Sequence, residues 1–305
     1  MKISIGTRGS KLALWQAHHV ADRLRQYGVA TEIVTISTKG DQQQSVSIAD
    51  IGTRGVFTEE IEAQLQRGTI DIAVHSAKDL QSELADAFEI IAFTERERMT
   101  DVLLSHLPLG TLTPTRTWTI GTSSARRKAL LNHYYPNLTT VEMRGNLQTR
   151  IAKMEAGQCD ALMLAYAGVH RMHYDAMIIH EFPLQQLIPA VGQGCIAVET
   201  LRELDKNKQD TVRAAINHEA TAQQLRTERA YLKTLRGGCS IPVFALAQQH
   251  AEIIRLEGGV VSLDGQQLVI DQAEGPLAEA ERVGERLAHA ILERGGRQIL
   301  DKIRV

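Results

Sequence analysis

The sequence of 305 residues predicts an α/β protein with two similar α/β halves and a smaller α+β unit after them. The main observation is an apolar strand, a glycine-containing turn and a helix, which occur together at residues 2–27 and again at residues 119–133. Strand and helix signals that alternate in this way are typical of sheets built largely from parallel strands. The C-terminal stretch differs, because strand signals at 253–256, 260–263 and 267–270 precede one amphipathic helix over 277–293. Asp264-Gly265 is a good hairpin turn between two of these strands.

Composition limits the classes of function. A net charge of −2 argues against a general nucleic-acid binder, and no apolar run approaches membrane-spanning length. Three cysteines without a CxxC pair indicate a reduced compartment and argue against a structural zinc site. The N-terminus leads directly into a strand, without the features of a signal peptide, so we expect a cytoplasmic protein with no metal. Arginine supplies 24 of the 34 cationic side chains, and its planar fork suits carboxylates.

The first half begins with a strand over 2–5, a turn over 6–10 and a helix over 12–27. Ser10 is a suitable N-cap, and the free N–H groups of a helix start favour an anion. Arg8 lies inside this turn, where it is either an anion contact or a solvated loop arginine. The later elements of this half are expected at 32–37 (strand), 58–66 (helix) and 89–93 (strand).

The central stretch of this half is Ile70–Asp79. Its apolar part, 70–74, is expected to form a buried strand. The strand ends in a polar group of side chains: His75, Ser76, Lys78 and Asp79. Because open α/β sheets bind ligands at the C-terminal ends of their strands, Lys78 and Asp79 are candidate functional residues. A surface ion pair remains the alternative for this stretch alone.

The second half opens with a strand that ends at Gly121 and a helix that runs to about His133. Thr122, Ser123 and Ser124 stand at the helix start, where hydroxyls, free N–H groups and the positive helix end predict an anion pocket. Arg126 and Arg127 follow in the first helical turn. Two cations there oppose the helix dipole, and this cost favours a bound anion over a plain surface.

Three more arginines of this half lie at or just after predicted strand ends: Arg144, Arg150 and Arg171. The strands are expected at 139–143 and 159–164, each followed by a helix, over 147–156 and 165–172. Taken singly, each arginine is best explained as a surface residue. Together with the Arg126-Arg127 pair, they would line one edge of a cleft.

A glycine-rich segment, 188–194, suits a chain that crosses between domains, and a strand over 195–199 and a mostly helical stretch over 212–235 follow it. The helix is expected to end at Arg236-Gly-Gly. Cys239 comes directly after these glycines, on a bend that backbone or ligand can approach closely. It is either a small buried apolar residue or a group with a covalent role.

The motifs, taken in order, resemble those of one known family. They are the central stretch, Gly121-Thr-Ser-Ser with its two arginines, Arg144-Gly-Asn, Val191-Gly-Gln-Gly and Gly237-Gly-Cys. Over almost the whole chain the sequence resembles the porphobilinogen deaminase (hydroxymethylbilane synthase) family. The resemblance implies a transferase (EC 2.5.1.61) that joins four porphobilinogens head to tail, with release of ammonia, to give 1-hydroxymethylbilane in tetrapyrrole biosynthesis. It also implies two periplasmic-binding-protein-like α/β domains around a cleft and a small C-terminal α+β domain.

The same resemblance implies roles for individual residues. Asp79 would be catalytic, and Cys239 would carry a dipyrromethane cofactor through a thioether. The other implied cofactor-binding residues are Lys78, Thr122, Ser123, Ser124, Arg126, Arg127 and Arg144. The implied substrate-binding residues are Arg8, Ser10, Arg150 and Arg171. The implied domains are 1–95 with 195–215, then 96–194, then 216–305 with the cofactor cysteine, in a monomer.

Two departures from the family pattern stand out. The family usually has Lys-Asp-Val-Pro where this chain has Lys78-Asp-Leu-Gln81, so the turn that aims Asp79 is expected to be looser. Many members have lysine at the positions of Arg54 and Glu59, and the reversed charge at Glu59 weakens any gating role for that loop.

Two other functions compete with this interpretation. A two-domain anion-binding protein without catalysis would explain the arginines, but neither Asp79 among cations nor Cys239 after two glycines. A cysteine-nucleophile enzyme, such as an acyl transferase, would need a histidine partner that no local motif supplies.

Overall fold

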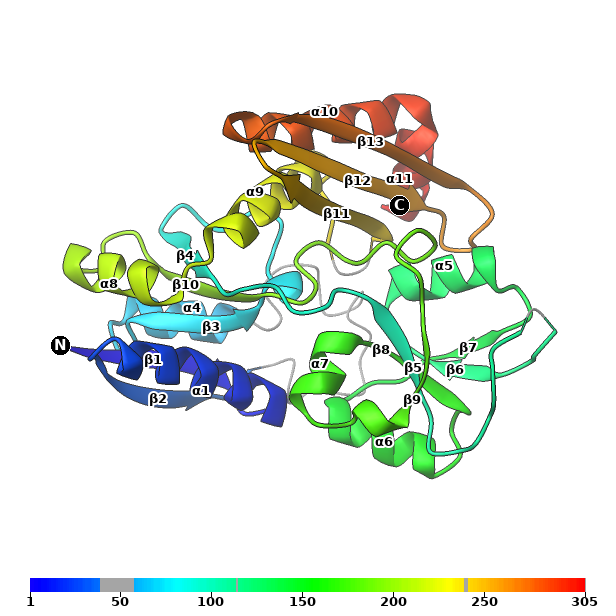
Figure 1. Cartoon of the computed structure of the whole chain (residues 1–305), viewed down its shortest axis with the longest axis horizontal. Helices are drawn as coiled ribbons and strands as arrows, with labels where there is room; N and C mark the ends of the chain where they lie inside the picture. The colour runs from blue at the N-terminus through cyan, green and yellow to red at the C-terminus, as the bar shows by residue number, and fades with distance from the viewer. Residues whose placement is uncertain (39–57, 114, 239–240, 305) are drawn as a thin grey trace. The chain divides into compact units, whose positions relative to one another are not determined.

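The computed structural model describes residues 1–38, 58–113, 115–238 and 241–304 (Figure 1). The chain divides into two compact units. Unit 1 is Met1–Glu97 with Gly194–Gln223, and unit 2 is Arg98–Gln193 with Gln224–Val305. Within the described ranges, no helix has both the length and the apolar character needed to cross a membrane.

Unit 1 contains a five-stranded mixed sheet. Its strands, in sheet order, are β2 (Ala30–Ile36), β1 (Lys2–Arg8), β3 (Ile72–Ser76), β10 (Ile196–Leu201) and β4 (Phe88–Phe93). Strand β1 is parallel to both β2 and β3, whereas β10 is antiparallel to β3 and β4. The order of the parallel strands therefore reverses at β1, which places a crevice at the C-terminal ends of β1 and β3.

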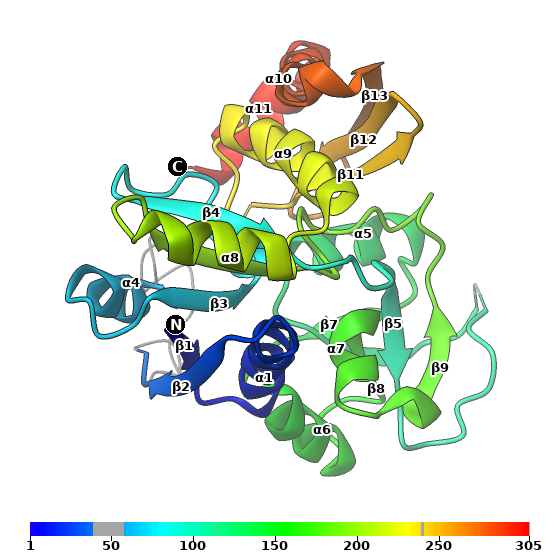
Figure 2. The ribbon, with the colours of Figure 1, turned by 60° about the vertical axis from the view of Figure 1, so that its left-hand side comes forward.

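Helices cover both faces of this sheet. They are α1 (Lys11–Gln26), α8 (Lys206–Ile216) and α4 (Glu59–Gln66), with the start of α9 (Glu219–Thr234). Helix α1 buries Ala17, Val20, Ala21 and Leu24, whose spacing of three and four residues forms one apolar stripe. That stripe shares a core with the buried side of α8, which lies alongside β4 in Figure 2. Helix α4 packs on the opposite face through Ile61 and Leu65.

Unit 2 contains a second five-stranded sheet with the same arrangement. Its strands, in sheet order, are β7 (Thr139–Val141), β6 (Thr119–Gly121), β8 (Ala161–Ala165), β5 (Asp101–Leu104) and β9 (Ile178–Glu181). Strand β6 is parallel to β7 and β8, and β5 is antiparallel to β8 and β9. Its helices are α5 (Ala125–Tyr134), α6 (Leu147–Glu155) and α7 (Tyr166–Arg171), with a 3-10 turn at Asp175–Met177. Two similar α/β halves were predicted, and the repeated strand order confirms them.

The C-terminal part of unit 2 is a three-stranded antiparallel sheet covered by helices, as predicted. The strands are β11 (Val243–His250), β12 (Ile253–Val261) and β13 (Leu268–Pro276). Most of α9, α10 (Ala280–Ile291) and α11 (Arg297–Ile303) supply the helical layer, and α10 lies along β13 in Figure 1. A 3-10 turn at Leu277–Glu279 precedes α10, and a kinked segment at Leu292–Gly296 follows it. The fold class expected from the sequence is therefore confirmed.

Some predicted elements were wrong in detail. Strands β5, β9 and β11 were not predicted, and two separate strands were expected where β12 runs continuously. The Gly258-Gly259 pair lies inside β12, where the neighbouring strands pack too closely against its backbone for a side chain. A Cβ on Gly259 would lie 2.3 Å from the Val269 carbonyl oxygen, and one on Gly258 would lie 2.9 Å from the Phe244 carbonyl oxygen. The turn predicted at Asp264-Gly265 does join β12 to β13, and Gly265 has a φ of +77° there.

Gly284 in α10 allows a close helix crossing and gives a test of the packing in unit 2. A Cβ at this position would lie 2.3 Å from the Thr227 carbonyl oxygen and 2.9 Å from the Tyr231 amide nitrogen, both in α9. We expect Gly284→Ala to lower the free energy of unfolding by about 1–3 kcal/mol, the usual cost of overpacking. Urea unfolding measures this loss. Glu285→Ala on the exposed face of α10 is the control, and equal stability of the two variants would contradict the packing argument.

Candidate active site

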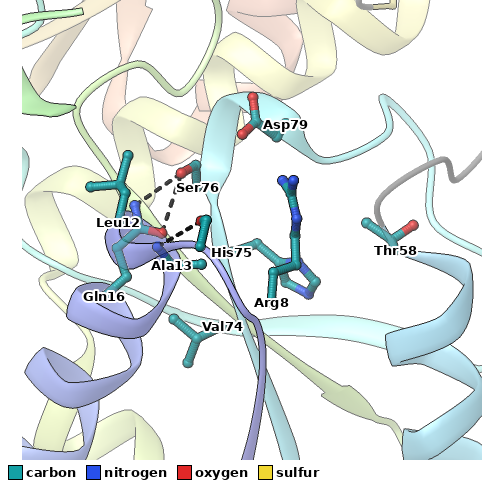
Figure 3. Close-up of a pocket in the computed structure, with 10 residues that line it drawn as sticks. Arg8, Leu12, Ala13, Gln16, Thr58, Val74, His75, Ser76 and Asp79 are labelled. Atoms are coloured by element: carbon teal, nitrogen blue, oxygen red, sulfur yellow. Dashed lines mark hydrogen bonds between the residues drawn. The ribbon is translucent and has the colours of Figure 1, made fainter. Parts of the chain in front are cut away.

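A pocket in unit 1 lies at the C-terminal ends of β1 and β3, where the strand order reverses (Figure 3). Its lining residues are Arg8, Ser10, Leu12, Ala13, Gln16, Thr58, Val74, His75, Ser76 and Asp79. Three predicted site residues, Arg8, Ser10 and Asp79, are therefore brought together in one pocket. In Figure 3 the Arg8 side chain extends between Ser76 and Thr58 toward the end of the pocket where Asp79 lies.

Asp79 is presented by a short rigid turn. It is the last residue of the 3-10 turn η1 (Ala77–Asp79), which continues directly from β3. The Ala77 amide donates to the Cys195 carbonyl oxygen (3.0 Å), and the buried Ala77 and Leu80 anchor the turn on both sides. The Asp79 side chain is exposed, and Lys78 beside it is half-buried.

Gln81, which replaces the usual proline of the family, has a contact of its own. Its Nε2 donates to Thr58 Oγ1 at 3.2 Å, and Thr58 is the residue just before α4. This hydrogen bond ties the segment after Asp79 to the start of α4. The looser turn expected from the sequence is thus offset by a polar contact.

Gln16 joins two walls of the pocket and was not predicted. It is buried in α1, and its Nε2 donates to Ser76 Oγ at 2.9 Å, across to the end of β3. A buried glutamine on the apolar face of a predicted helix was the available signal, since buried amides need partners.

A buried contact between a histidine and a glutamate lies behind the same pocket. His75 Nε2 is 2.9 Å from Glu199 Oε2 of β10, and the two side chains are 5% and 0% exposed. Glu62 of α4 is close enough to interact with both. Burial raises the pKa of Glu62, the hydrogen bond with Thr58 opposes the shift, and the charge of Glu199 adds to it. Sequence reasoning missed Glu199 and Glu62 because their partner is distant in the chain.

The turn of unit 2 for which the sequence predicts an anion pocket joins the end of β6 to the start of α5. Ser124 is the N-cap of α5, and its Oγ accepts from the Arg127 amide (3.4 Å). Ser123 Oγ donates to the Met143 carbonyl oxygen at 2.7 Å, and Thr122 Oγ1 accepts from the Ser124 amide at 3.3 Å. These contacts hold the three hydroxyl residues in one turn at the start of α5.

Arg126 and Arg127 are buried and share one carboxylate, that of Asp101 at the start of β5. Arg126 Nη2 lies 2.7 Å from Asp101 Oδ2, and Arg127 Nη2 and Nε lie 2.7 and 3.0 Å from Oδ1. Burial by itself would raise the pKa of Asp101, but the charges of Arg126 and Arg127 lower it to about 2. Sequence reasoning did not find Asp101, because the strand that begins there was not predicted.

Arg144, Arg150 and Arg171 lie beyond the ends of β7 and β8, which are the neighbours of β6. Arg144 Nε pairs with Glu142 at 3.0 Å, and Arg150 Nε donates to the Gly145 carbonyl oxygen at 2.7 Å. Arg171 ends α7 and is buried. Because β6, β7 and β8 are parallel, their C-terminal ends share one edge of the sheet, so the five predicted arginines gather along it.

Two sequence-based predictions lie outside the described residues. They are the cofactor cysteine Cys239 and the loop arginine Arg54. The other two cysteines, Cys159 and Cys195, are free and buried. Over the ranges that the structure describes, no cluster of three or more His, Cys, Asp or Glu side chains could hold a metal ion.

The fold and the two groups of side chains define a class of protein: a repeated α/β protein that presents arginines, hydroxyls and one exposed carboxylate at the ends of its strands. Comparison with known proteins makes the class specific. The family model described as porphobilinogen deaminase, dipyromethane cofactor binding domain, matches residues 3–210. The model of the porphobilinogen deaminase C-terminal domain matches residues 222–293.

Curated relatives agree with the family models. Porphobilinogen deaminase of Desulfosudis oleivorans is 52% identical over 305 residues, which cover 100% of this chain and 98% of that protein. The enzyme of Cytophaga hutchinsonii is 52% identical over 302 residues, covering 99% and 97%. Among solved structures, a VFT2 domain of BvgS from Bordetella pertussis has a TM-score of 0.44 at 16% identity, covering 70% of this chain and 86% of that one.

The chain belongs to the porphobilinogen deaminase family, which confirms the resemblance seen in its motifs. Its activity is that of porphobilinogen deaminase (EC 2.5.1.61) in tetrapyrrole biosynthesis, its substrate is porphobilinogen, and it carries the dipyrromethane cofactor-binding domain. Membership of this family decides against a binding protein without catalysis and against a cysteine-nucleophile acyl transferase.

The shared carboxylate of Asp101 should make unit 2 sensitive to acid. Its pKa of about 2 in the folded protein lies below the ordinary 3.8. The ionised Asp101 carboxylate therefore stabilises the folded protein fully at pH values above 3.8. We expect a contribution of about 2 kcal/mol to be lost as the pH falls from about 4 toward about 2. Urea unfolding of a Trp15→Phe protein, followed by the fluorescence of Trp118 in unit 2, measures it.

The same titration of Asp101→Asn should have a flatter dependence on pH, whereas Asp301→Asn at an exposed position should follow the parent. An Asp101→Asn protein that loses stability as steeply as the parent would contradict the assignment.

Proposed function

We propose that Asp79 is the catalytic group of this porphobilinogen deaminase, and that the arginines and hydroxyls at the strand ends bind the carboxylates of cofactor and substrate. The observation that carries the proposal is the pocket of unit 1. It places one exposed carboxylate and Arg8 together at the point of the sheet where α/β proteins bind ligands.

The reaction passes through a positively charged pyrrole, which a nearby carboxylate such as that of Asp79 can stabilise. Loss of ammonia from porphobilinogen leaves an electron-poor pyrrole, and the bond to the next ring forms through a cationic pyrrole. The carboxylate of Asp79 stabilises this positive charge and accepts or returns the proton that the ring gives up. Its fixed turn holds it in place, so little reorganisation is needed when the charge develops. A lysine or arginine at position 79 would oppose the same step.

Arg8 and Ser10 are proposed to bind the substrate. Each porphobilinogen carries an acetate and a propionate, and arginine forms paired hydrogen bonds with such groups. Arg8 reaches into the pocket from the end of β1, while Ser10 caps α1 and keeps the free N–H groups of its first turn in line. Arg150 and Arg171 are proposed to bind further substrate carboxylates as the chain grows.

The side chains of unit 2 fit a ligand with several carboxylates. Arg126 and Arg127 carry two positive charges against the single charge of Asp101, so the cluster keeps an excess positive charge. We assign cofactor binding to seven residues besides the attachment point: Lys78, Thr122, Ser123, Ser124, Arg126, Arg127 and Arg144. When bound through Cys239, the dipyrromethane would supply the pyrrole to which the first substrate unit is joined.

The wider organisation follows the same proposal. The chain would act as a cytoplasmic monomer with three domains, namely 1–95 with 195–215, 96–194 and 216–305. The third would carry Cys239. A thioether there would tether the growing product and keep its reacting end close to the catalytic carboxylate.

The role of Asp79 is tested by Asp79→Asn. We expect the variant to fold, because the side chain is exposed, and to lose about 100-fold or more in kcat, as is usual for a lost acid–base group. Steady-state formation of hydroxymethylbilane measures the loss. Asp86→Asn, also at an exposed position of unit 1, should retain the parent rate. Turnover of Asp79→Asn close to that of the parent would exclude the assigned role.

The attachment point is tested by the intact mass of the purified protein. We expect excess mass equal to two linked pyrrole units in the parent and in Cys159→Ala, and none in Cys239→Ser, because only a thiolate at that position forms the thioether. If the parent carries no excess mass, it is incubated with porphobilinogen and weighed again. Excess mass that persists in Cys239→Ser would place the attachment elsewhere.

A further inference from the structure

Asp101 is the most heavily used buried acceptor of unit 2, and the reaction itself gives it no role. The side chain is fully buried, and its two oxygens accept four hydrogen bonds. Three come from Arg126 and Arg127, and the fourth comes from Gln193 Nε2 at 3.0 Å. The carboxylate is therefore the common partner of two adjacent arginines.

Gln193 also holds the carboxylate, through the oxygen that Arg127 bonds. Its Nε2 also lies 2.7 Å from the Met99 carbonyl oxygen and 3.4 Å from the Thr100 carbonyl oxygen. The residue before it, Gly192, is held in turn, because its amide donates to Glu228 Oε2 at 2.8 Å. Asp101 thus lies at the start of β5, and the segment that contains Gly192 and Gln193 is hydrogen-bonded next to it.

The geometry sets the direction of both guanidinium groups. Arg126 spans from Asp101 to the Ile188 carbonyl oxygen (2.9 Å), and Arg127 spans from Asp101 to the Met163 carbonyl oxygen (3.1 Å). Each fork is held at two ends, and the side chains of Arg126 and Arg127 are only 5% and 7% exposed. Without the shared carboxylate, two neighbouring cations in one helical turn would repel each other and separate.

The charges in this cluster do not balance. Two guanidinium groups meet one carboxylate, and a buried excess charge is costly unless an anion compensates it. Within the described part of the chain, the buried Arg126 Nε also has no hydrogen-bond partner. A pair selected for stability alone would need only one arginine per carboxylate, so the second arginine points to a ligand carboxylate as the missing anion.

We infer that Asp101 is a positioning residue for cofactor binding, which fixes Arg126 and Arg127 so that one positive charge is left for a carboxylate of the dipyrromethane. Gln193 supports it by fixing the carboxylate. The inference rests on the proposed cofactor-binding role of the two arginines and adds the residue through which that role is organised.

The test measures cofactor loading rather than turnover. Apoprotein from cells that make no porphobilinogen is incubated with porphobilinogen, and the gain of two pyrrole units is followed by intact mass. We expect Asp101→Asn to load about tenfold or more slowly than the parent, as is typical when a residue that orients a binding group is removed. Near-ultraviolet circular dichroism shows whether the variant is folded.

A second variant covers the case in which Asp101→Asn does not fold. Asp101→Glu retains the charge but moves the carboxylate by one methylene group, so the fold is kept while both forks are displaced. We expect slowed loading here too. A folded Asp101→Glu or Asp101→Asn protein that loads at the parent rate would overturn the inference.

Coupling separates positioning from a purely structural role. If Asp101 acts through Arg127, Arg127→Lys should slow loading little further in the Asp101 variant that folds. Arg150 is not bonded to Asp101. The factor by which Arg150→Lys slows loading should therefore be the same in the parent and in the Asp101 variant, so that the two effects multiply. Effects that multiply equally in both pairs would show that Asp101 acts only on stability.

The single variants Arg126→Leu and Arg127→Leu separate the cofactor-binding role of the arginines from the positioning role of Asp101. If both load at the parent rate, the proposed cofactor-binding role of the arginines fails, and the inference fails with it. If they load slowly while folded Asp101 variants load normally, only the role of Asp101 is wrong.

Discussion

The buried contact of Asp101 with Arg126 and Arg127 is the interaction on which the proposed anion-binding edge of unit 2 depends. Two arginines in the first turn of a helix are unfavourable for the helix dipole and for each other. One carboxylate, delivered by the antiparallel strand β5, offsets both costs and fixes the direction of each fork. The proposed binding edge is therefore ordered before any ligand arrives, and the free energy of cofactor binding there would not be spent on ordering long side chains.

The same topology explains why functional residues recur at equivalent places in the two units. In each five-stranded sheet the order of the parallel strands reverses at the first strand of the repeat, β1 or β6. A short turn and a serine-capped helix follow each of these strands. Unit 1 adds an exposed carboxylate after β3, and unit 2 adds arginines after β6, β7 and β8. Under the proposed function, the repeat thus supplies two binding edges, and Asp79 belongs to the edge of unit 1.

Local signals made much of this predictable from sequence. Each of these signals can be recognised within a few residues of sequence: the apolar run before His75, the hydroxyls of Thr122–Ser124 and the arginines after strand ends. The residues that were missed depend on distant partners. Asp101 pairs with a helix some 25 positions away, and Glu199 meets His75 from the far end of unit 1. The break expected between residues 256 and 260 of β12 was wrong for the same reason, since the backbone and ring that pack against Gly258 and Gly259 belong to other strands.

A buried acid in an apolar strand is nevertheless a signal that sequence analysis can use. Glu199 interrupts β10 and Asp101 opens β5, and these two strands hold the same antiparallel position in their sheets. An ionised carboxylate in such a strand costs several kcal/mol unless a cation and hydrogen bonds compensate it. Its presence therefore implies a basic partner from a neighbouring element. In unit 1 that partner is His75, which lines the pocket, and in unit 2 it is the Arg126-Arg127 pair, to which cofactor binding is assigned by proposal, so each acid lies next to a proposed site.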